Sequence, residues 1–242
     1  MIDISQNWDQ KQNILVILAH PDDPEFFCGA TLARWTRAGH DISYVLITCG
    51  DKGRNDHNHH IPSEELCSLR HKEERAAAAI IGVTNVDFLD KEDGYLVPDL
   101  NLRKEIVRII RQKKPDVIVT CDPQNLFASY GLNHPDHRAA GQVVLDAVFP
   151  AAGNELFFPD LFLQENLSPH SPKEVWVSLT NQPNVSIDVT DTWHIKIEAL
   201  KQHKSQIGDP IQMEERQRKR HSQDSTPENP RYEEHFRVIS WR

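Results

Sequence analysis

The feature that most constrains this chain is a short aliphatic segment that ends in a cluster of polar residues. Residues 14–18 read Ile-Leu-Val-Ile-Leu, and Ala19-His20-Pro-Asp-Asp-Pro-Glu25 follows directly. A run this short, with β-branched side chains, is typical of a buried strand. The prolines prevent the strand from continuing. Because ligands of open α/β sheets bind beyond the carboxyl ends of the strands, we expect a metal or catalytic site at residues 20–25.

Strand and helix patterns alternate along the rest of the chain. Residues 28–38 have helical spacing and residues 42–48 form a second aliphatic strand, which completes a strand-helix-strand unit. Further strands are predicted at 86–89, 115–122, 174–179 and 185–189, and further helices at 63–82, 102–112, 135–148 and 190–206. We therefore predict an α/β, Rossmann-like three-layer fold with a mainly parallel sheet, to which 174–179 and 185–189 add a C-terminal antiparallel part.

The chain length predicts one domain. The 242 residues are enough for a single sizeable α/β domain. We expect residues 1–242 to form that domain, with a core at about 13–207 and a charged C-terminal segment at 208–242 that includes a solvated helix.

Composition excludes several classes of protein. The net charge of -9 provides no positive field for nucleic acid. No apolar run approaches the roughly 20 residues of a membrane helix. The first nine residues show no basic segment followed by an apolar core, so we expect no signal peptide. Four widely spaced cysteines form no Cys-x-x-Cys pair, so we expect reduced, buried thiols in a cytoplasmic protein.

A second polar cluster, His134-Pro-Asp-His137, begins the helix predicted at 135–148. Its histidines are three residues apart, as are His20 and Asp23, so each pair can face one point. Two such clusters at one sheet edge can supply three protein ligands to a catalytic zinc and leave a position for water, with Asp22 available to accept the proton of that water. Either segment alone is commonly a turn with a capping aspartate, but their joint occurrence favours the metal site.

Both clusters resemble the signatures of the PIG-L/LmbE-like family of zinc-dependent deacetylases of N-acetylglucosamine type. The first signature is similar to Ala19-His-Pro-Asp-Asp-Pro-Glu25 with the following Cys28-Gly-Ala-Thr-Leu-Ala, and the second to His134-Pro-Asp-His-Arg-Ala-Ala-Gly141. Arg70 with Glu73 and Glu74, Asp93-Gly94 and residues 200–206 agree further, so the resemblance extends over about residues 13–207.

The resemblance implies a role for each matching residue. The implied ligands of one Zn2+ per chain, with Fe2+ as an alternative, are His20, Asp23 and His137. Asp22 would be the general base. His134 would stabilise the oxyanion or protonate the leaving amine, and Asp136 would orient it. The implied sugar contacts are Arg70 and Asp93, for which a surface salt bridge and a turn aspartate are the alternatives.

The activity implied by the resemblance is removal of the N-acetyl group from an N-acetylglucosamine-type amino sugar or its conjugate, giving acetate and a free amine. One alternative is an amidase acting on a sugar-thiol conjugate or a larger N-acyl group. Another is a non-catalytic sugar- or metal-binding protein of the same fold. A nucleotide-binding Rossmann domain is disfavoured because no Gly-x-Gly-x-x-Gly follows the first strand. The expected partner is a small N-acetylated sugar, and the resemblance allows a homo-oligomer.

Some positions depart from the family pattern or have no assigned role. Phe27 and Ala30 stand where many members have glycine, which implies a tighter surface behind the first cluster. Tyr130 cannot be assigned to oxyanion stabilisation. A polar lid is favoured over a second metal for the loop containing His57, His59 and His60. His203 is expected either to pack or to reach the site from the C-terminal helix.

Overall fold

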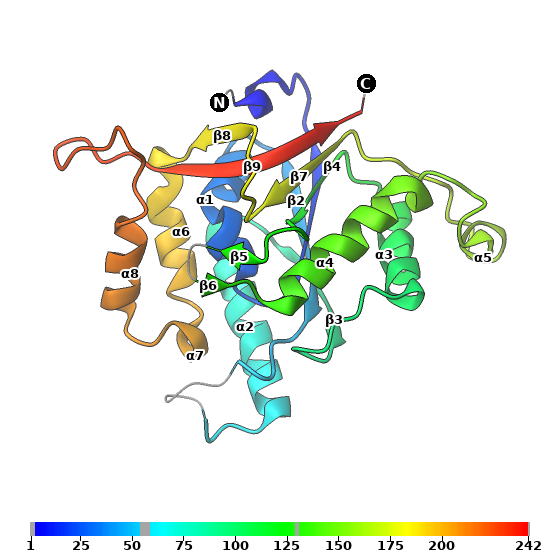
Figure 1. Ribbon diagram of the computed structural model, residues 1–242, viewed down its shortest axis with the longest axis horizontal. Coiled ribbons are helices and arrows are strands. Elements are labelled where there is room, and N and C mark those ends of the chain that lie inside the picture. Colours follow the sequence, from blue (N-terminus) through cyan, green and yellow to red (C-terminus); the bar gives the residue numbers. More distant parts are fainter. Residues whose placement is uncertain (1–2, 54–58, 129–130, 242) are drawn as a thin grey trace.

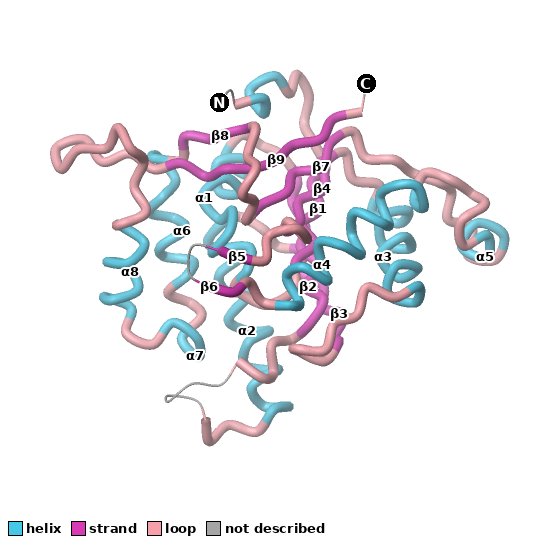
Figure 2. Tube along the Cα trace, in the orientation of Figure 1, coloured by secondary structure: helices cyan, strands magenta, loops and turns pink. Residues whose placement is uncertain are grey.

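The computed structural model describes residues 3–53, 59–128 and 131–241 and has a central sheet between two layers of helices (Figures 1 and 2). Within these residues the main sheet has seven strands in the order β3-β2-β1-β4-β7-β9-β8. The strands are β1 (Asn13–Leu18), β2 (Asp41–Thr48), β3 (Asn85–Lys91), β4 (Val117–Cys121), β7 (Glu174–Ser178), β8 (Val185–Asp188) and β9 (Glu233–Ser240). A small hairpin pairs β5 (Phe127–Ala128) with β6 (Gly131–Leu132). The predicted three-layer α/β fold is confirmed.

Strand β1 lies at the centre of the parallel part of the sheet. It pairs with β2 on one side and β4 on the other, both in parallel. Its side chains alternate between two cores: Ile14, Val16 and Leu18 pack on one face of the sheet, and Leu15 and Ile17 on the other. A strand that is buried on both faces must be apolar at every position, which explains the uninterrupted aliphatic run.

The helices cover both faces of the sheet (Figure 1). One layer contains α1 (Asp23–Arg37), α2 (Ser63–Ile81) and α6 (Trp193–Leu200), and the other contains α3 (Leu100–Lys113) and α4 (Pro135–Asp146), which continues into the π-helical η2 (Ala147–Ala152). Shorter elements are η1 (Ile4–Asn7), α5 (Pro159–Leu163), η3 (Thr190–Thr192), α7 (Lys204–Ile207) and α8 (Pro210–Arg218). None of the helices in the described ranges has both the length and the apolar character of a membrane-crossing segment.

One expectation about the C-terminal part of the sheet is wrong. Strand β7 extends the parallel sheet by pairing with β4, whereas β8 is antiparallel, as expected, and pairs with β9. Strand β9, which the sequence analysis did not predict, runs antiparallel to both β7 and β8. Its buried positions are Glu234, Phe236 and Val238, and charged residues lie between them. Because one buried position is a glutamate, the segment lacks the regular apolar–polar alternation that predicts a strand.

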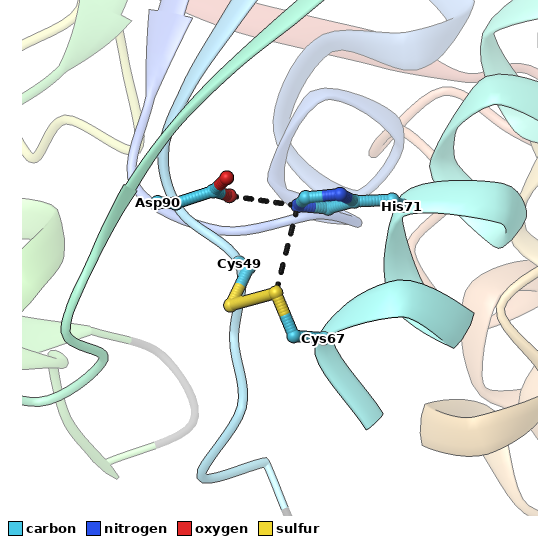
Figure 3. A group of neighbouring side chains, drawn as sticks. All are labelled: Cys49, Cys67, His71 and Asp90. Atoms are coloured by element: carbon cyan, nitrogen blue, oxygen red, sulfur yellow. Dashed lines mark hydrogen bonds and ion pairs between the residues drawn. A yellow bond between two sulfur atoms is a disulfide. The ribbon is translucent and has the colours of Figure 1, made fainter. Parts of the chain in front are cut away.

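The prediction of four reduced cysteines is also wrong. Cys49, directly after β2, and Cys67, in the first half of α2, form a disulfide with their Cα atoms 5.1 Å apart (Figure 3). Cys28 and Cys121 are free and buried. Spacing along the chain could not reveal the pair, because the two cysteines are 18 positions apart and β2 and α2 come together only in the folded protein.

A buried ion pair joins β9 to the helices next to it. Lys196 Nζ on α6 lies 2.7 Å from Glu234 Oε1, and both side chains are almost fully buried. The carboxylate also accepts hydrogen bonds from the backbone N–H groups of Ala30 and Thr31 in α1. Glu234 therefore links the last strand to α1 and α6.

We predict that Glu234→Ala will lower the free energy of unfolding by about 3–5 kcal/mol, because the substitution leaves a buried ammonium without its counter-ion. The matched control is Arg218→Ala, which removes an exposed i,i+4 pair with Glu214 and should cost less than about 1 kcal/mol. Urea unfolding followed by circular dichroism would measure both values. Equal effects of the two substitutions would contradict the role of Glu234.

Candidate active site

The carboxyl ends of β1 and β2 open onto a cavity of about 740 Å³. Both polar clusters of the sequence contribute to its lining, which includes His20, Asp22, Asp23, Arg70, Asp93, His134 and His137. A cavity of this volume is large enough for a small-molecule ligand. The structure therefore brings together seven of the eight predicted site residues, and Asp136 lies directly behind them.

The first cluster turns sharply from β1 into α1. Asp23 is the first residue of α1, and its Oδ2 accepts hydrogen bonds from the backbone N–H groups of Ala19 and His20, at 3.1 and 2.8 Å. Pro24 fits the first turn of the helix, where no backbone donor is needed. The helix thus begins five residues earlier than predicted, and the turn fixes the carboxylate of Asp23 beside the imidazole of His20.

The second cluster is the beginning of α4. His134 is the N-cap, and its Nδ1 accepts a hydrogen bond from the backbone N–H of Asp136. Gly141 lets α4 approach the end of β4 closely, because a Cβ atom there would collide with the carbonyl oxygen of Cys121. This close approach places His137, one helical turn after His134, over the first cluster.

The two clusters converge on the carboxylate of Asp23. His137 Nε2 lies 3.1 Å from Asp23 Oδ1, and His20 Nδ1 lies 3.5 Å from Asp23 Oδ2. One ring nitrogen each of His20, His134 and His137 also lie within 4.8 Å of one another. Imidazole nitrogens and a carboxylate oxygen at such separations can share one divalent ion, so the donor set fits a catalytic zinc.

Hydrogen bonds on the far side of each ring orient the two histidines. His20 Nε2 lies 3.1 Å from Asp93 Oδ1 and 3.5 Å from Asp136 Oδ2, and His137 Nδ1 lies 2.8 Å from Asn133 Oδ1. If these nitrogens carry the protons, the other nitrogen of each ring presents a lone pair toward Asp23. Ligating histidines in metal sites are held by outer carboxylates and carbonyl oxygens in the same way.

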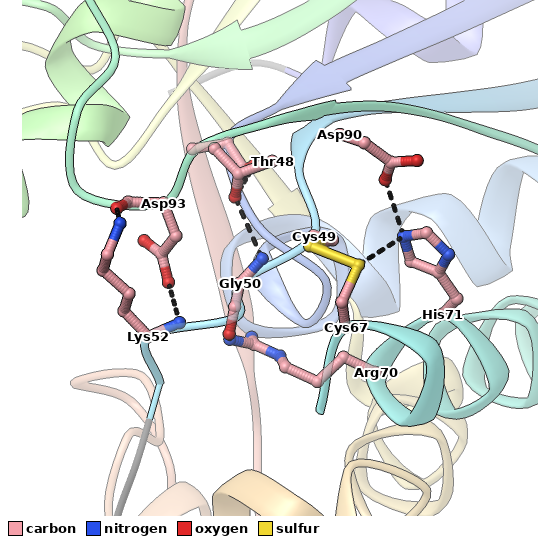
Figure 4. Close-up of a disulfide and its surroundings, with 10 residues drawn as sticks. Thr48, Cys49, Gly50, Lys52, Cys67, Arg70, His71, Asp90 and Asp93 are labelled. Carbon is pink, nitrogen blue, oxygen red and sulfur yellow. Dashed lines mark hydrogen bonds and ion pairs between the residues drawn. A yellow bond between two sulfur atoms is a disulfide. The ribbon is translucent and has the colours of Figure 1, made fainter. Parts of the chain in front are cut away.

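Two aspartates with predicted roles lie beside His20 in the structure. Asp136 was expected to orient His134, but its carboxylate accepts hydrogen bonds from the backbone N–H groups of Gly94 and Leu96 and lies beside His20. Asp93 was expected to contact the sugar. It lines the cavity, but it contacts His20 and accepts a hydrogen bond from the backbone N–H of Lys52 (Figure 4). Both aspartates therefore contact His20, and their predicted roles stay predictions.

Asp22 is held in a strained backbone conformation. Its φ of 102° lies in the left-handed region, which costs free energy for a residue with a Cβ atom. Its backbone N–H donates to Glu74 Oε2 at 2.9 Å, and its Oδ2 lies 3.1 Å from Arg70 Nη2. Arg70 and Glu74, both on α2, therefore hold the main chain and the carboxylate of Asp22 in place.

Arg70 is itself buried and fixed by backbone carbonyls. Its Nη1 donates to the carbonyl oxygen of Gly50 at 2.8 Å (Figure 4). Its Nη2 donates to the carbonyl oxygen of Pro21. Gly50 has a φ of 67°, and a Cβ atom there would collide with the guanidinium. Arg70 is only 3% exposed, and it contacts the side chain of Asp22. It also lines the cavity.

Burial and neighbouring charges separate the pKa values of the two adjacent aspartates. Burial raises the pKa of Asp22, and Arg70 opposes that effect only in part. Burial would also raise the pKa of Asp23, but His137 and His20 outweigh it and lower that pKa. Burial lowers the pKa of His134. Asp22 thus has the raised pKa that suits a general base, and Asp23 the anionic state that suits a ligand.

A fully buried cluster beneath Asp22 was not assigned by the sequence analysis. His203 Nε2 lies 3.1 Å from Glu25 Oε2 and 3.9 Å from Glu74 Oε2. Burial raises the pKa of both glutamates well above its ordinary value. The sequence offered one indication of this cluster, because Glu25 belongs to the first motif. The contact of α1 and α2 with residue 203 forms only when the chain folds, so the sequence could not predict it.

The outer wall of the cavity comes from segments far from the motifs. It includes Phe27, Trp193, Lys196, Arg220 and His235. Phe27, which stands where the family often has glycine, packs its ring edge-on against His137 at 5.1 Å. Nothing in the sequence predicted that the other four residues would line the cavity. His57 and Tyr130 lie outside the described residues, and His59 and His60 are exposed and do not line the cavity.

Known proteins resemble this chain over most of its length. The sequence profile described as PIG-L, GlcNAc-PI de-N-acetylase, matches residues 15–148. The diacetylchitobiose deacetylase of Thermococcus kodakarensis is 33% identical over 208 residues, which cover 86% of this chain and 75% of that protein. The probable N-acetyl-alpha-D-glucosaminyl L-malate deacetylase 2 of Bacillus anthracis is 25% identical over 206 residues, which cover 83% and 84%.

A solved structure shares the fold over nearly the whole chain. The N,N'-diacetylchitobiose deacetylase from Pyrococcus horikoshii, complexed with its inhibitor MPG, has a TM-score of 0.86 and 29% sequence identity. The match covers 98% of this chain and 87% of that chain. The likeness therefore extends over nearly the whole chain and not only over the two motifs.

We predict that Glu74→Gln will gain stability relative to the parent protein as the pH rises. Burial raises the pKa of Glu74, so the folded chain keeps a proton that the unfolded chain releases above about pH 4.3. The free energy of unfolding should then fall by up to about 1.4 kcal/mol per pH unit until the pH passes the raised pKa. Gln binds no such proton, so the stability difference between variant and parent should widen from about pH 5 upward until the pH passes the raised pKa of Glu74.

Guanidinium unfolding at several pH values would test this prediction. Glu198→Gln, on the exposed side of α6, is the matched control for removing a carboxylate. Parallel curves for Glu74→Gln and the parent would show that Glu74 carries no extra proton in the folded state.

Proposed function

Because this chain belongs to the PIG-L family of GlcNAc-PI de-N-acetylases, we propose that it is a zinc-dependent hydrolase of N-acetylated amino sugars. The proposed reaction removes the N-acetyl group from an N-acetylglucosamine-type sugar or its conjugate and gives acetate and a free amine. The observation that carries this proposal is the convergence of His20, His137 and Asp23 in one cavity, with Asp22 beside them.

The donor set supports the proposed metal. His20, Asp23 and His137 would hold the ion, with His20 and His137 oriented by Asp93, Asp136 and Asn133. Three ligands of nitrogen and oxygen type suit Zn2+, and Fe2+ is the second candidate. When bound, the ion would supply Lewis acidity, polarising the acetamide carbonyl and acidifying water.

Asp22 is proposed to be the general base. Its carboxylate faces the cavity next to the proposed ligands, and its raised pKa allows it to collect the proton of the attacking water. Arg70 fixes one carboxylate oxygen of Asp22, and Glu74 fixes the backbone. The resulting alignment is set before substrate binds, which is how positioned groups lower a reaction barrier.

His134 is proposed to act on the opposite side of the reacting amide. Its Nδ1 is engaged at the start of α4, and the residue lines the cavity. Its ring lies 4.7 Å from that of His20, between centroids. The remaining ring nitrogen would stabilise the developing oxyanion or donate a proton to the leaving amine.

The cavity favours a saccharide over a small amide alone. Its volume of about 740 Å³ exceeds the needs of a single acetamide group, and its wall combines aromatic Phe26 and Phe27 with charged Lys52 and Arg220. The relatives named as diacetylchitobiose and N-acetylglucosaminyl L-malate deacetylases share an N-acetylglucosamine unit in their substrates. We therefore place that unit over the proposed ligands and its substituent toward the wall.

Two alternatives make different use of the same residues. An amidase for a sugar-thiol conjugate or a larger N-acyl group would differ only in the pocket. A non-catalytic binding protein would not need the strained Asp22 with its supporting Arg70 and Glu74. The cytoplasmic location, the homo-oligomer and the single domain over residues 1–242 stay predictions.

We predict that Asp22→Asn will keep its zinc but lower kcat by about 10²–10⁴-fold, because the amide cannot accept a proton. His137→Ala should lose both zinc and activity. Asp87→Asn, on β3 and outside the cavity lining, is the control and should match the parent. Zinc content by atomic emission and amine release from N,N'-diacetylchitobiose are the measurements. Full activity of Asp22→Asn would remove Asp22 from its role, and unchanged zinc in His137→Ala would refute that ligand.

We predict about one zinc ion per chain in protein with its disulfide intact. Chelation should abolish amine release, and added Zn2+ or Fe2+ should restore it, with the more effective ion identifying the preferred metal. Comparing N-acetyl with longer N-acyl glucosamines would separate the deacetylase from the broader amidase. Hydrolysis that survives complete metal removal would contradict the proposal.

A further inference from the structure

A second group of metal-binding side chains lies outside the cavity. Its members are Cys49, Cys67, His71 and Asp90, and Figure 3 shows them facing one another. One donor atom from each lies within 4.8 Å of all the others. They come from three elements: Cys49 follows β2, Cys67 and His71 are one turn apart on α2, and Asp90 lies near the end of β3. None of the four belongs to the cavity lining given by the described residues.

The separations within this group are close to those of a tetrahedral site. His71 Nε2 lies 2.9 Å from Asp90 Oδ1 and 3.8 Å from Cys67 Sγ. With Zn–S bonds of about 2.3 Å and Zn–N bonds of about 2.0 Å, neighbouring donors of a tetrahedral zinc lie about 3.3–3.8 Å apart. The His71 ring is already oriented, because it stacks on Phe88 with the ring centroids 3.8 Å apart. Only the two sulfur atoms, which form a disulfide here, would have to separate.

We propose that this group is a second metal site, which opens when the Cys49–Cys67 disulfide is reduced and closes when it forms again. Two thiolates, one imidazole and one carboxylate would take a single divalent ion of zinc type. Thiolates are soft ligands and favour zinc over calcium or magnesium. The proposed catalytic centre offers only nitrogen and oxygen donors, so the two sites are chemically distinct.

A dithiol can serve as the reductant that converts the Cys49–Cys67 disulfide into two thiols. One thiolate of the dithiol attacks a sulfur of the Cys49–Cys67 bond, and its second thiol resolves the mixed disulfide. Two electrons and two protons pass to the protein, which gains two cysteine thiols, and the reductant becomes a disulfide. Binding of the metal ion then releases one proton from each thiol.

The group can be reached from solvent. Cys49 is buried, Cys67 and His71 are half-buried, and the Asp90 side chain is 57% exposed. A reductant and a metal ion can therefore approach from the side of Asp90. By contrast, the free Cys28 and Cys121 are fully buried and have no such access.

The group lies next to the contacts of Arg70, so a disulfide or a metal ion there would hold the segment that positions Arg70 (Figure 4). Cys49 immediately precedes Gly50, whose carbonyl oxygen accepts the hydrogen bond of Arg70. Cys67 lies one helical turn before Arg70 on α2. A disulfide and a bound metal ion would each tie the end of β2 to α2 at the point where Arg70 holds Asp22.

Cobalt spectroscopy tests the proposal independently of catalysis. The full-length His137→Ala protein, in which the proposed catalytic centre is disabled, would be reduced with a phosphine until a denatured sample titrates as four thiols, and the folded protein would then be given Co2+ without oxygen. We expect about one equivalent of Co2+ to bind with a near-ultraviolet sulfur-to-cobalt absorption, because only this site contains thiolates. The same protein with its disulfide intact should show no such absorption.

Two matched cysteine variants identify the ligands. Cys67→Ser should lose the sulfur-to-cobalt absorption, whereas Cys28→Ala, which removes a buried thiol elsewhere, should retain it; circular dichroism would confirm that both are folded. Absence of the absorption in the reduced parent, or its persistence in Cys67→Ser, would overturn the proposal. Neither result depends on deacetylation, so failure of the proposed function would leave this test unaffected.

Discussion

Two imidazole nitrogens and two backbone N–H groups meet at the carboxylate of Asp23, and this meeting organises both motifs. The N–H groups of Ala19 and His20 fix one oxygen of the carboxylate, which aligns the start of α1 with the end of β1. His137 approaches the other oxygen from α4, more than 100 residues along the chain. A buried carboxylate in this position needs positive partners, and protonated imidazoles or a metal ion can supply them.

The supporting residues form a layer that the two motifs do not contain. Arg70 and Glu74 of α2 hold Asp22 in its left-handed conformation, while Asp93 and Asp136 hold the His20 ring. Strain of this kind persists only where surrounding contacts outweigh it. Helix α2 therefore packs on the sheet and also, through Arg70 and Glu74 on its buried face, fixes the position of Asp22, the proposed base.

The sequence was informative where a local pattern determines the structure. The aliphatic run at β1 and the His-x-x-Asp and His-x-x-His spacings predicted a buried strand and a common site, and the structure brings those residues together. The sequence was less informative where long-range contacts decide. The pairing of β9 depends on a buried Glu234 that is compatible with the core only because Lys196 lies opposite. The contact of Asp136 with His20, and the disulfide, likewise arise from elements that meet only after folding.

The two motifs and the outer wall of the cavity come from different parts of the chain. The groups proposed to react lie within residues 20–137, inside the family match, whereas Trp193, Arg220 and His235 lie after residue 148, where that match ends. Substitutions at these three wall positions can therefore alter which substituent of the proposed sugar substrate is accommodated without moving the groups proposed to carry out hydrolysis. This division gives evolution a route to new specificities on an unchanged chemical framework, and it makes Trp193, Arg220 and His235 the positions to diversify in a laboratory search for altered substrate preference.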